Sequence, residues 1–284
     1  MSKLSIIILT YNSNKFIKPC LDSVFSQNCQ DFEVIVVDNG SRDGTAESVS
    51  NDYPQVILIK NKVNLGACKA RNQGISISKG EWIITMDCDI ILHKDFLIST
   101  SNLIKNLPPK IGIIQPKVLK ENNKIIFSTG IHLSFLKRFY DIGKGRLAKG
   151  KFNKSRYIFG ACSAAAFYKR DLLDELHEGT GYFDERFFFL VEDVDLSWRA
   201  KQRGWKAVYY PEAVCSHVGN SSRTDSALRR YFCFRNRYLM INKNETAIGR
   251  VRIYSCSFPY EISRFLYLVF TNKYFWKSSQ LNWH

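Results

Sequence analysis

Apolar runs alternate with amphipathic segments along the first third of the chain. Four short runs have the length and the β-branched content of buried strands, at residues 4–9, 34–37, 56–59 and 82–86. Between them, apolar residues recur at helical spacing over residues 14–27, 43–50 and 66–78. Parallel strands need such helical crossovers, so this order predicts an α/β fold with a Rossmann-like, mostly parallel sheet.

The pattern becomes less regular after residue 90. A helix is predicted from about residue 95 to the two prolines at 108–109, and a strand is predicted over 111–116. Residues 118–157 favour a β-hairpin and a mobile loop, because the glycines near residues 143–150 lie among lysines and arginines.

A further helix is predicted from Glu192, because Gly204 is a typical residue just past a helix end. A short strand is predicted over 207–210, and from about residue 225 the chain has a helical, basic and aromatic pattern. We therefore expect an α/β domain over 1–222, with halves at 1–110 and 111–222, and a C-terminal region over 223–284.

Composition indicates the size of the core and the cellular compartment. The chain has 284 residues and is 45% hydrophobic, which is enough for a sizeable core. A strand pattern begins at Leu4 and no apolar run approaches the length of a membrane-spanning helix, so we expect neither a signal peptide nor a span. None of the eight cysteines has Cys-x-x-Cys spacing, which favours reduced thiols in a cytoplasmic protein.

The charge is strongly positive and unevenly distributed. The formal net charge is +15, and eleven basic residues stand against three acidic ones from residue 223 onward. Such an excess favours nucleic acid, anionic lipid or phosphorylated substrates as partners, without distinguishing among them. A solvated basic surface is the simpler alternative.

Two carboxylates follow the fourth predicted strand, at Asp87 and Asp89. Open α/β sheets bind their ligands at the carboxyl ends of the strands. Paired carboxylates offer hard oxygen ligands to Mg²⁺ or Mn²⁺, and the cation can then hold a diphosphate. Because Asp-x-Asp is a common sequence, an acidic loop without a ligand is the alternative.

Polar residues also follow the first two predicted strands. Thr10, Tyr11 and Asn12 end the first, and Asp38 ends the second. Asp38 can accept hydrogen bonds from a nucleotide base and Tyr11 can pack on one, although Asp-Asn-Gly-Ser is also typical turn chemistry. Arg71, in the third predicted helix, is a candidate anion or base contact, or else one partner of a surface salt bridge.

Glu192 and Asp193 directly follow the apolar run at 187–191. Acids in the first turn of a helix are favoured by its dipole, so a capping role is one explanation. A carboxylate at the wall of an apolar cleft also gains the basicity that a general base needs. His217, after the strand at 207–210, is a candidate third metal ligand or a structural histidine.

In order and spacing these motifs resemble family-two glycosyltransferases of the GT-A fold. The matching segments span roughly residues 4–240 and lie at 5–12, 36–45, 64–66, 70–74, 87–89, 183–188, 192–196 and His217. Within that family, the Asp-Asn-Gly-Ser turn and the Phe-Phe-Phe-x-x-Glu-Asp-Val-Asp-Leu segment most resemble bacterial rhamnosyltransferases of polysaccharide assembly.

The resemblance implies a role for each candidate residue. Asp193 would deprotonate the acceptor hydroxyl, Glu192 would position the acceptor, and Asp89 with His217 would hold Mn²⁺ or Mg²⁺. The residues that would bind the nucleotide are Thr10, Tyr11, Asn12, Asp38, Arg71 and Asp87. Residues 1–110 would then form a nucleotide-binding half and residues 111–222 an acceptor-binding half.

The implied reaction is an inverting sugar transfer in cell-surface polysaccharide synthesis. The donor would be dTDP-rhamnose or a UDP-sugar, and the acceptor a hydroxyl of a glycan or a polyprenyl-linked lipid at the cytosolic face of the bacterial membrane. The aromatic and basic C-terminal region would touch that membrane as a peripheral helix or pack on the catalytic domain.

Two other functions fit parts of the pattern. A non-catalytic basic module that binds nucleotides, nucleic acid or membranes is the main alternative, but the acidic cluster would repel phosphates unless a metal were present. A nucleotidyltransferase would need a glycine-rich basic loop after the first strand, where Thr10-Tyr11-Asn12 stands instead. Because the acidic cluster would repel phosphates, we expect no nucleic-acid partner.

Overall fold

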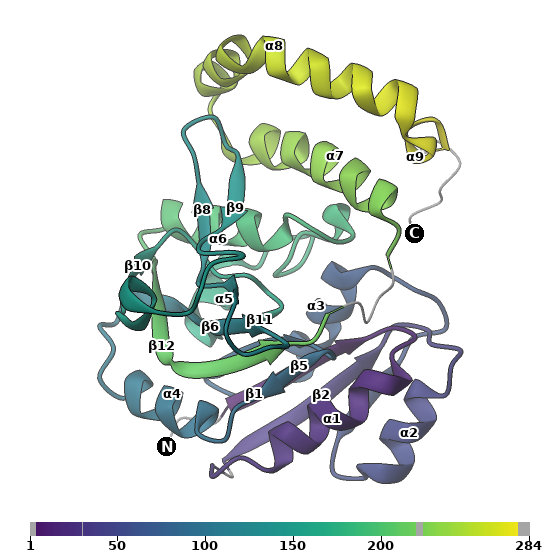
Figure 1. Ribbon diagram of the computed structural model, residues 1–284, viewed down its shortest axis with the longest axis vertical. Helices are drawn as coiled ribbons and strands as arrows, with labels where there is room; N and C mark the ends of the chain where they lie inside the picture. Colours follow the sequence, from purple (N-terminus) through teal and green to yellow (C-terminus); the bar gives the residue numbers. More distant parts are fainter. Residues whose placement is uncertain (1–3, 30, 220–223, 278–284) are drawn as a thin grey trace.

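The parallel half of the sheet forms from the four apolar runs of the N-terminal region. The computed structural model describes residues 4–29, 31–219 and 224–277 (Figure 1). Strands β1 (Leu4–Thr10), β2 (Phe32–Asp38), β3 (Ile57–Lys60) and β4 (Trp82–Asp87) lie in the order β4-β1-β2-β3, all parallel. Helices α1 (Asn14–Phe25), α2 (Thr45–Asp52) and α3 (Ala67–Ile77) connect them, as predicted.

The second half of the chain extends the same sheet beyond β4. Strand β11 (Ala165–Lys169) pairs antiparallel with β4 and with β6 (Ile111–Lys120), and β12 (Lys206–His217) runs parallel to β6. Three short strands complete its edge: β5 (Ile90–Leu92), β7 (Ile126–Ser128) and β10 (Arg156–Ile158). The predicted mostly parallel, mixed sheet flanked by helices is therefore confirmed.

One predicted strand is longer than its apolar run indicated. The run at 207–210 ends before Pro211, but β12 continues through a register shift between Tyr210 and Val214 and reaches His217. A proline is tolerated at such an irregularity because no ladder hydrogen bond is needed there. The extension matters because it carries His217 to the same edge of the sheet as Asp87.

Side chains alternate between two cores, one on each face of the sheet. Ile6 and Ile8 of β1 point to α1, α2 and α4 (Phe96–Ile104), whereas Ile7 points to α3 and to α5 (Arg170–Leu176) and α6 (Glu192–Gln202). Both faces are covered, which explains why the strands read as continuous apolar runs rather than alternating ones.

Smaller elements surround the edge of the sheet near its second half. The predicted hairpin within 118–157 is formed by β8 (Ile131–Leu133) and β9 (Phe139–Asp141). Two 3₁₀ turns, η1 (Gly150–Asn153) and η2 (Glu185–Phe187), follow later in the chain. The glycine-rich segment after β9 is attached to β7, since Ile126 exchanges main-chain hydrogen bonds with Gly145 and Arg146.

The C-terminal region is helical, as predicted, and forms an outer layer. Helix α7 (Ser226–Asn244) packs on α6 and η2, and α8 (Ala247–Thr271) with the short α9 (Lys273–Lys277) lies beyond it (Figure 1). Among the described helices, none combines the length and apolar content needed to cross a bilayer. The division of the chain at residues 222–223 lies outside the described residues and stays a prediction.

Candidate active site

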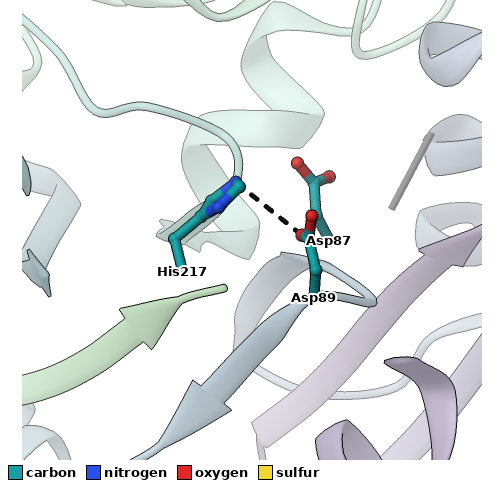
Figure 2. Close-up of side chains that lie close together, drawn as sticks. All are labelled: Asp87, Asp89 and His217. Atoms are coloured by element: carbon teal, nitrogen blue, oxygen red, sulfur yellow. Dashed lines mark ion pairs between the residues drawn. The ribbon is translucent and has the colours of Figure 1, made fainter. Parts of the chain in front are cut away.

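Three side chains that can bind a metal converge at the carboxyl edge of the sheet. Asp87 ends β4, Asp89 lies in the turn before β5, and His217 ends β12 (Figure 2). Pairing of β12 with β5 fixes this arrangement, because it sets His217 opposite Ile90. One ligand atom from each side chain lies within 4.8 Å of the others, and His217 Nε2 is 3.7 Å from Asp89 Oδ1.

The chemistry of these donors fits a divalent cation that favours oxygen ligands. Two carboxylates and one imidazole suit Mn²⁺ and also accommodate Mg²⁺. Three protein ligands leave coordination positions open for the oxygen atoms of a second molecule. The imidazole is held in place by Phe127 of β7, whose ring stacks on it with 4.2 Å between centroids.

A buried arginine joins this cluster to a second pair of acids. The Arg71 guanidinium donates to Asp87 Oδ1 at 2.9 Å and to Glu192 Oε1 at 2.6 Å. Burial raises the pKa of Asp87, and the charge of Arg71 opposes that rise. Buried charges of this kind are stable only when paired, so Arg71 couples the end of β4 to the start of α6.

Asp193 lies beside Glu192 in the first turn of α6. Its Oδ2 accepts a hydrogen bond from the Ser163 main-chain N–H at 3.2 Å, and Ser163 Oγ donates to Glu192 Oε1 at 3.3 Å. Burial, together with the neighbouring charge of Glu192, raises the pKa of Asp193 to about 8. A carboxylate with this raised basicity is suited to accept a proton from a hydroxyl group.

The ends of β1 and β2 provide a separate group of polar side chains. Thr10 and Asp38 are register partners, and both are buried. Asp38 Oδ2 accepts from the Ser41 N–H at 3.0 Å, while Asp38 Oδ1 is buried and has no partner among the described residues. A buried acceptor without a donor is costly, so this atom is suited to a donor from a bound molecule.

Tyr11 and Asn12, the other predicted nucleotide-binding residues after β1, are less buried than Thr10 and Asp38. Asn12 is exposed and links two loops: its N–H donates to Ser41 Oγ at 2.8 Å, and its Oδ1 accepts from the Arg42 N–H at 2.8 Å. Tyr11 is half-buried beside it. Asn12 therefore has a structural role in the closely spaced loops after β1 and β2.

The structure thus places every predicted site residue at one edge of the sheet or in the elements that adjoin it. The loop leading to Glu192 depends on contacts from α7 that no motif indicated. Phe188, Leu190 and Val191 have positive φ angles of 64°, 67° and 75°. Asn236 of α7 donates to the carbonyls of Phe187, Phe189 and Leu190 at 2.8 to 2.9 Å, which holds this unusual turn in place.

Comparison with known proteins assigns the family. The family model described as Glycosyl transferase family 2 matches residues 5–177, which is more than half of the chain. The chain belongs to this family. The resemblance noted in the sequence is confirmed at the level of the family, and the likeness to rhamnosyltransferases stays a prediction.

Two curated relatives show how much of the chain is shared. The chain is 25% identical over 219 residues to the poly-beta-1,6-N-acetyl-D-glucosamine synthase of Staphylococcus aureus (strain COL), covering 75% of this chain and 49% of that protein. It therefore spans about half the length of that relative. Glycosyltransferase GlyG of Streptococcus pneumoniae serotype 4 is 27% identical over 209 residues, which is 68% of each chain.

Solved structures confirm the GT-A-like fold. A mannosyltransferase from Pyrobaculum calidifontis, in complex with GDP-Man and Mn²⁺, aligns with a TM-score of 0.60 at 19% identity over 95% of this chain and 71% of its own. Residues 1–349 of S. aureus TarS align with a TM-score of 0.61 at 19% identity over 95% of this chain and 72% of that one. At these identities the likeness concerns the fold alone.

Proposed function

We propose that this protein is an inverting glycosyltransferase that moves a sugar from a nucleoside diphosphate to a hydroxyl group of an acceptor. The observation that carries the proposal is the position of Arg71 between Asp87 and Glu192. One guanidinium thereby joins the candidate metal cluster to Glu192, the chain neighbour of the candidate general base Asp193. A sugar transferase needs a cation on the leaving-group side of the reacting carbon and a base on the acceptor side.

The donor half of the site is suited to a pyrimidine nucleotide. Asp38 Oδ1, a buried acceptor, would accept a hydrogen bond from the ring N–H that uracil and thymine share. Thr10 is the register partner of Asp38, and Tyr11 follows Thr10 in the chain. Asp87, Asp89 and His217 would hold Mn²⁺ or Mg²⁺. When bound, the cation would neutralise the charge on the diphosphate leaving group. The donor would be a UDP-sugar or dTDP-rhamnose; S. aureus TarS has been solved with UDP.

Asp193 would act on the acceptor. It would take the proton from the acceptor hydroxyl as that oxygen attacks the anomeric carbon, and Glu192 would help to position the acceptor. The new bond forms on the face opposite the departing diphosphate, so the configuration at that carbon is inverted. No covalent intermediate between sugar and enzyme is required.

The acceptor would be a glycan or a polyprenyl-linked lipid in cell-surface polysaccharide synthesis. We place the reaction in the cytoplasm, at the cytosolic face of the bacterial membrane. The name of the relative poly-beta-1,6-N-acetyl-D-glucosamine synthase agrees with polysaccharide synthesis, and the name Glycosyltransferase GlyG agrees with sugar transfer. A non-catalytic basic module is the alternative function. Such a module would not need a carboxylate of raised basicity at Asp193.

Loss of the base tests this proposal. Asp193→Asn should bind the donor as the unsubstituted protein does but lower sugar transfer by about 10²- to 10⁴-fold, the contribution typical of a positioned general base. Transfer is measured as the release of UDP or dTDP from a panel of their sugars with membrane glycolipid as acceptor and Mn²⁺ present. Asp171→Asn, an exposed change on α5, is the control and should leave the rate unchanged. Full activity in Asp193→Asn would overturn the assignment.

A further inference from the structure

Helix α8 has its apolar side chains on the outside. Six apolar residues at intervals of three, four or seven share one face, and each is between 42% and 83% exposed: Ile248, Val251, Phe258, Ile262, Leu266 and Phe270. The opposite face packs on α7 and carries Ile253 and Leu268, but also the polar residues Ser257 and Glu261. A surface helix of a globular protein ordinarily has the reverse arrangement.

Two neighbouring elements extend this exposed apolar face. Phe135, in the turn between β8 and β9, is 59% exposed and lies under the Arg252 guanidinium, 4.7 Å from its ring centroid. Trp276 of α9 is 68% exposed and donates its indole N–H to the Val269 carbonyl at 2.8 Å. Exposed apolar patches of this extent on a folded domain mark contact surfaces.

A basic pocket lies between α7, α8 and the β8–β9 hairpin. It has a volume of about 520 Å³, and its lining includes Arg138, Arg230, Arg237 and Arg264. Arg237 is neutralised by Glu261, with 2.7 Å between Nη1 and Oε1. No carboxylate among the described residues forms an ion pair with the other three arginines.

The arginine from the hairpin is already positioned for an anion. Its guanidinium lies 3.6 Å from the centroid of the Tyr260 ring, which fixes its plane. The Nε of Arg138 is buried and has no hydrogen-bond partner among the described residues. A buried donor on a charged group is costly to leave unpaired, so the pocket is suited to a phosphate.

We propose that α8 lies in the interface of an anionic membrane, with its apolar face among the headgroups and upper acyl chains, and that the arginine pocket binds a phospholipid phosphate. Aromatic and aliphatic residues on one side and arginines beside them are what such an interface selects. In Figure 1, α8 is the outermost layer, on the far side of α7 from the sheet. A membrane can therefore cover it without covering the sheet edge.

Charge favours a lipid surface over a second copy of the chain. Residues from 223 onward carry eleven basic and three acidic side chains. Two copies packed through α8 would bring these like charges together, whereas anionic headgroups neutralise them. The proposal does not depend on the reaction assigned above, since donor binding needs no membrane.

Flotation with lipid vesicles tests the apolar face. The full chain should bind phosphatidylglycerol-containing vesicles and should bind pure phosphatidylcholine at least tenfold more weakly. The triple variant Ile262→Ser, Leu266→Ser, Phe270→Ser should lose at least tenfold in binding to anionic vesicles. Tyr157→Ser, an equally exposed change on β10, is the control and should bind normally. An unchanged thermal midpoint would show that both variants fold.

A pair of adjacent arginines tests the pocket. Arg230→Gln, in the pocket, should weaken vesicle binding about fivefold, as expected for one basic group at an anionic surface. Arg229→Gln removes the same charge from the next position of α7, outside the pocket lining, and should have a much smaller effect. Equal losses in both variants would overturn the phosphate site. Vesicle-independent dimers that the triple variant abolishes would overturn the membrane assignment.

Discussion

The carboxyl edge of the sheet and the C-terminal helices differ in how their charges are compensated. At the edge, the buried guanidinium of Arg71 has carboxylate partners on both sides. In the pocket between α7 and α8, three arginines have no carboxylate partner among the described residues. The arginine at the sheet edge is thus held in place by carboxylates of the protein, whereas the three arginines of the outer pocket are neutralised only by the charge of a bound partner.

Removing Arg71 should have the largest effect on the first region. Arg71→Gln leaves the buried Glu192 and the half-buried Asp87 without their shared cation, so the free energy of unfolding should fall by about 3–5 kcal/mol, and transfer should be lost. Urea denaturation gives the stability. Arg203→Gln, an exposed change at the end of α6, is the control, with an expected change under about 0.5 kcal/mol. Equal stability of the two variants would show that Arg71 does not couple the two pairs of acids.

The turn before Glu192 provides a second, smaller test. Gly66 has a φ of +86°, and a Cβ added there would lie 2.5 Å from the Phe188 ring and 2.8 Å from the Phe188 carbonyl oxygen. Gly66→Ala should therefore destabilise the protein by about 1–3 kcal/mol, as overpacking does. Gly145 has a similar φ of +78° but open space around it, so Gly145→Ala isolates the cost of the backbone alone. Thermal unfolding should show the larger loss for Gly66→Ala.

The third test is the pH dependence of stability due to Asp193. Its pKa of about 8 in the folded protein means that the folded state keeps a proton that the unfolded state releases near pH 4. The stabilisation from this proton is complete below pH 4 and is lost as the pH rises to about 8. Asp193→Asn should thus gain stability relative to the unsubstituted protein between pH 5 and pH 8, by about 1.4 kcal/mol for each pH unit. Denaturant midpoints across this range should diverge, and parallel curves would contradict the raised pKa.

Local sequence signals were sufficient to predict the fold and most of the candidate residues at the carboxyl edge of the sheet. The strands that end at Thr10, Asp38 and Asp87 are short apolar runs followed by polar turns, and each signal lies within a few residues. Their parallel pairing then follows from the helical crossovers. The acids at the carboxyl edge could therefore be predicted without any long-range information.

The contacts that organise the site could not be predicted in this way. Asn236 lies 46 to 49 residues from the carbonyls it holds, and Ser163 lies 30 residues before Asp193. A single asparagine or serine leaves no periodic pattern in the sequence, so only the tertiary structure reveals such a role. The outer face of α8 is a similar case, since an apolar stripe does not show which side packs on α7.

Metal-dependent donor binding at the sheet edge is the decisive measurement for the proposed glycosyltransferase. We would measure thermal stabilisation by UDP-, dTDP- and GDP-sugars with and without Mn²⁺, for the unsubstituted protein and for Asp89→Asn. We predict Mn²⁺-dependent stabilisation by a uracil or thymine nucleotide sugar, and its loss in Asp89→Asn. Stabilisation by no nucleotide in folded protein, or stabilisation unaffected by Mn²⁺ and by Asp89→Asn, would contradict this proposal.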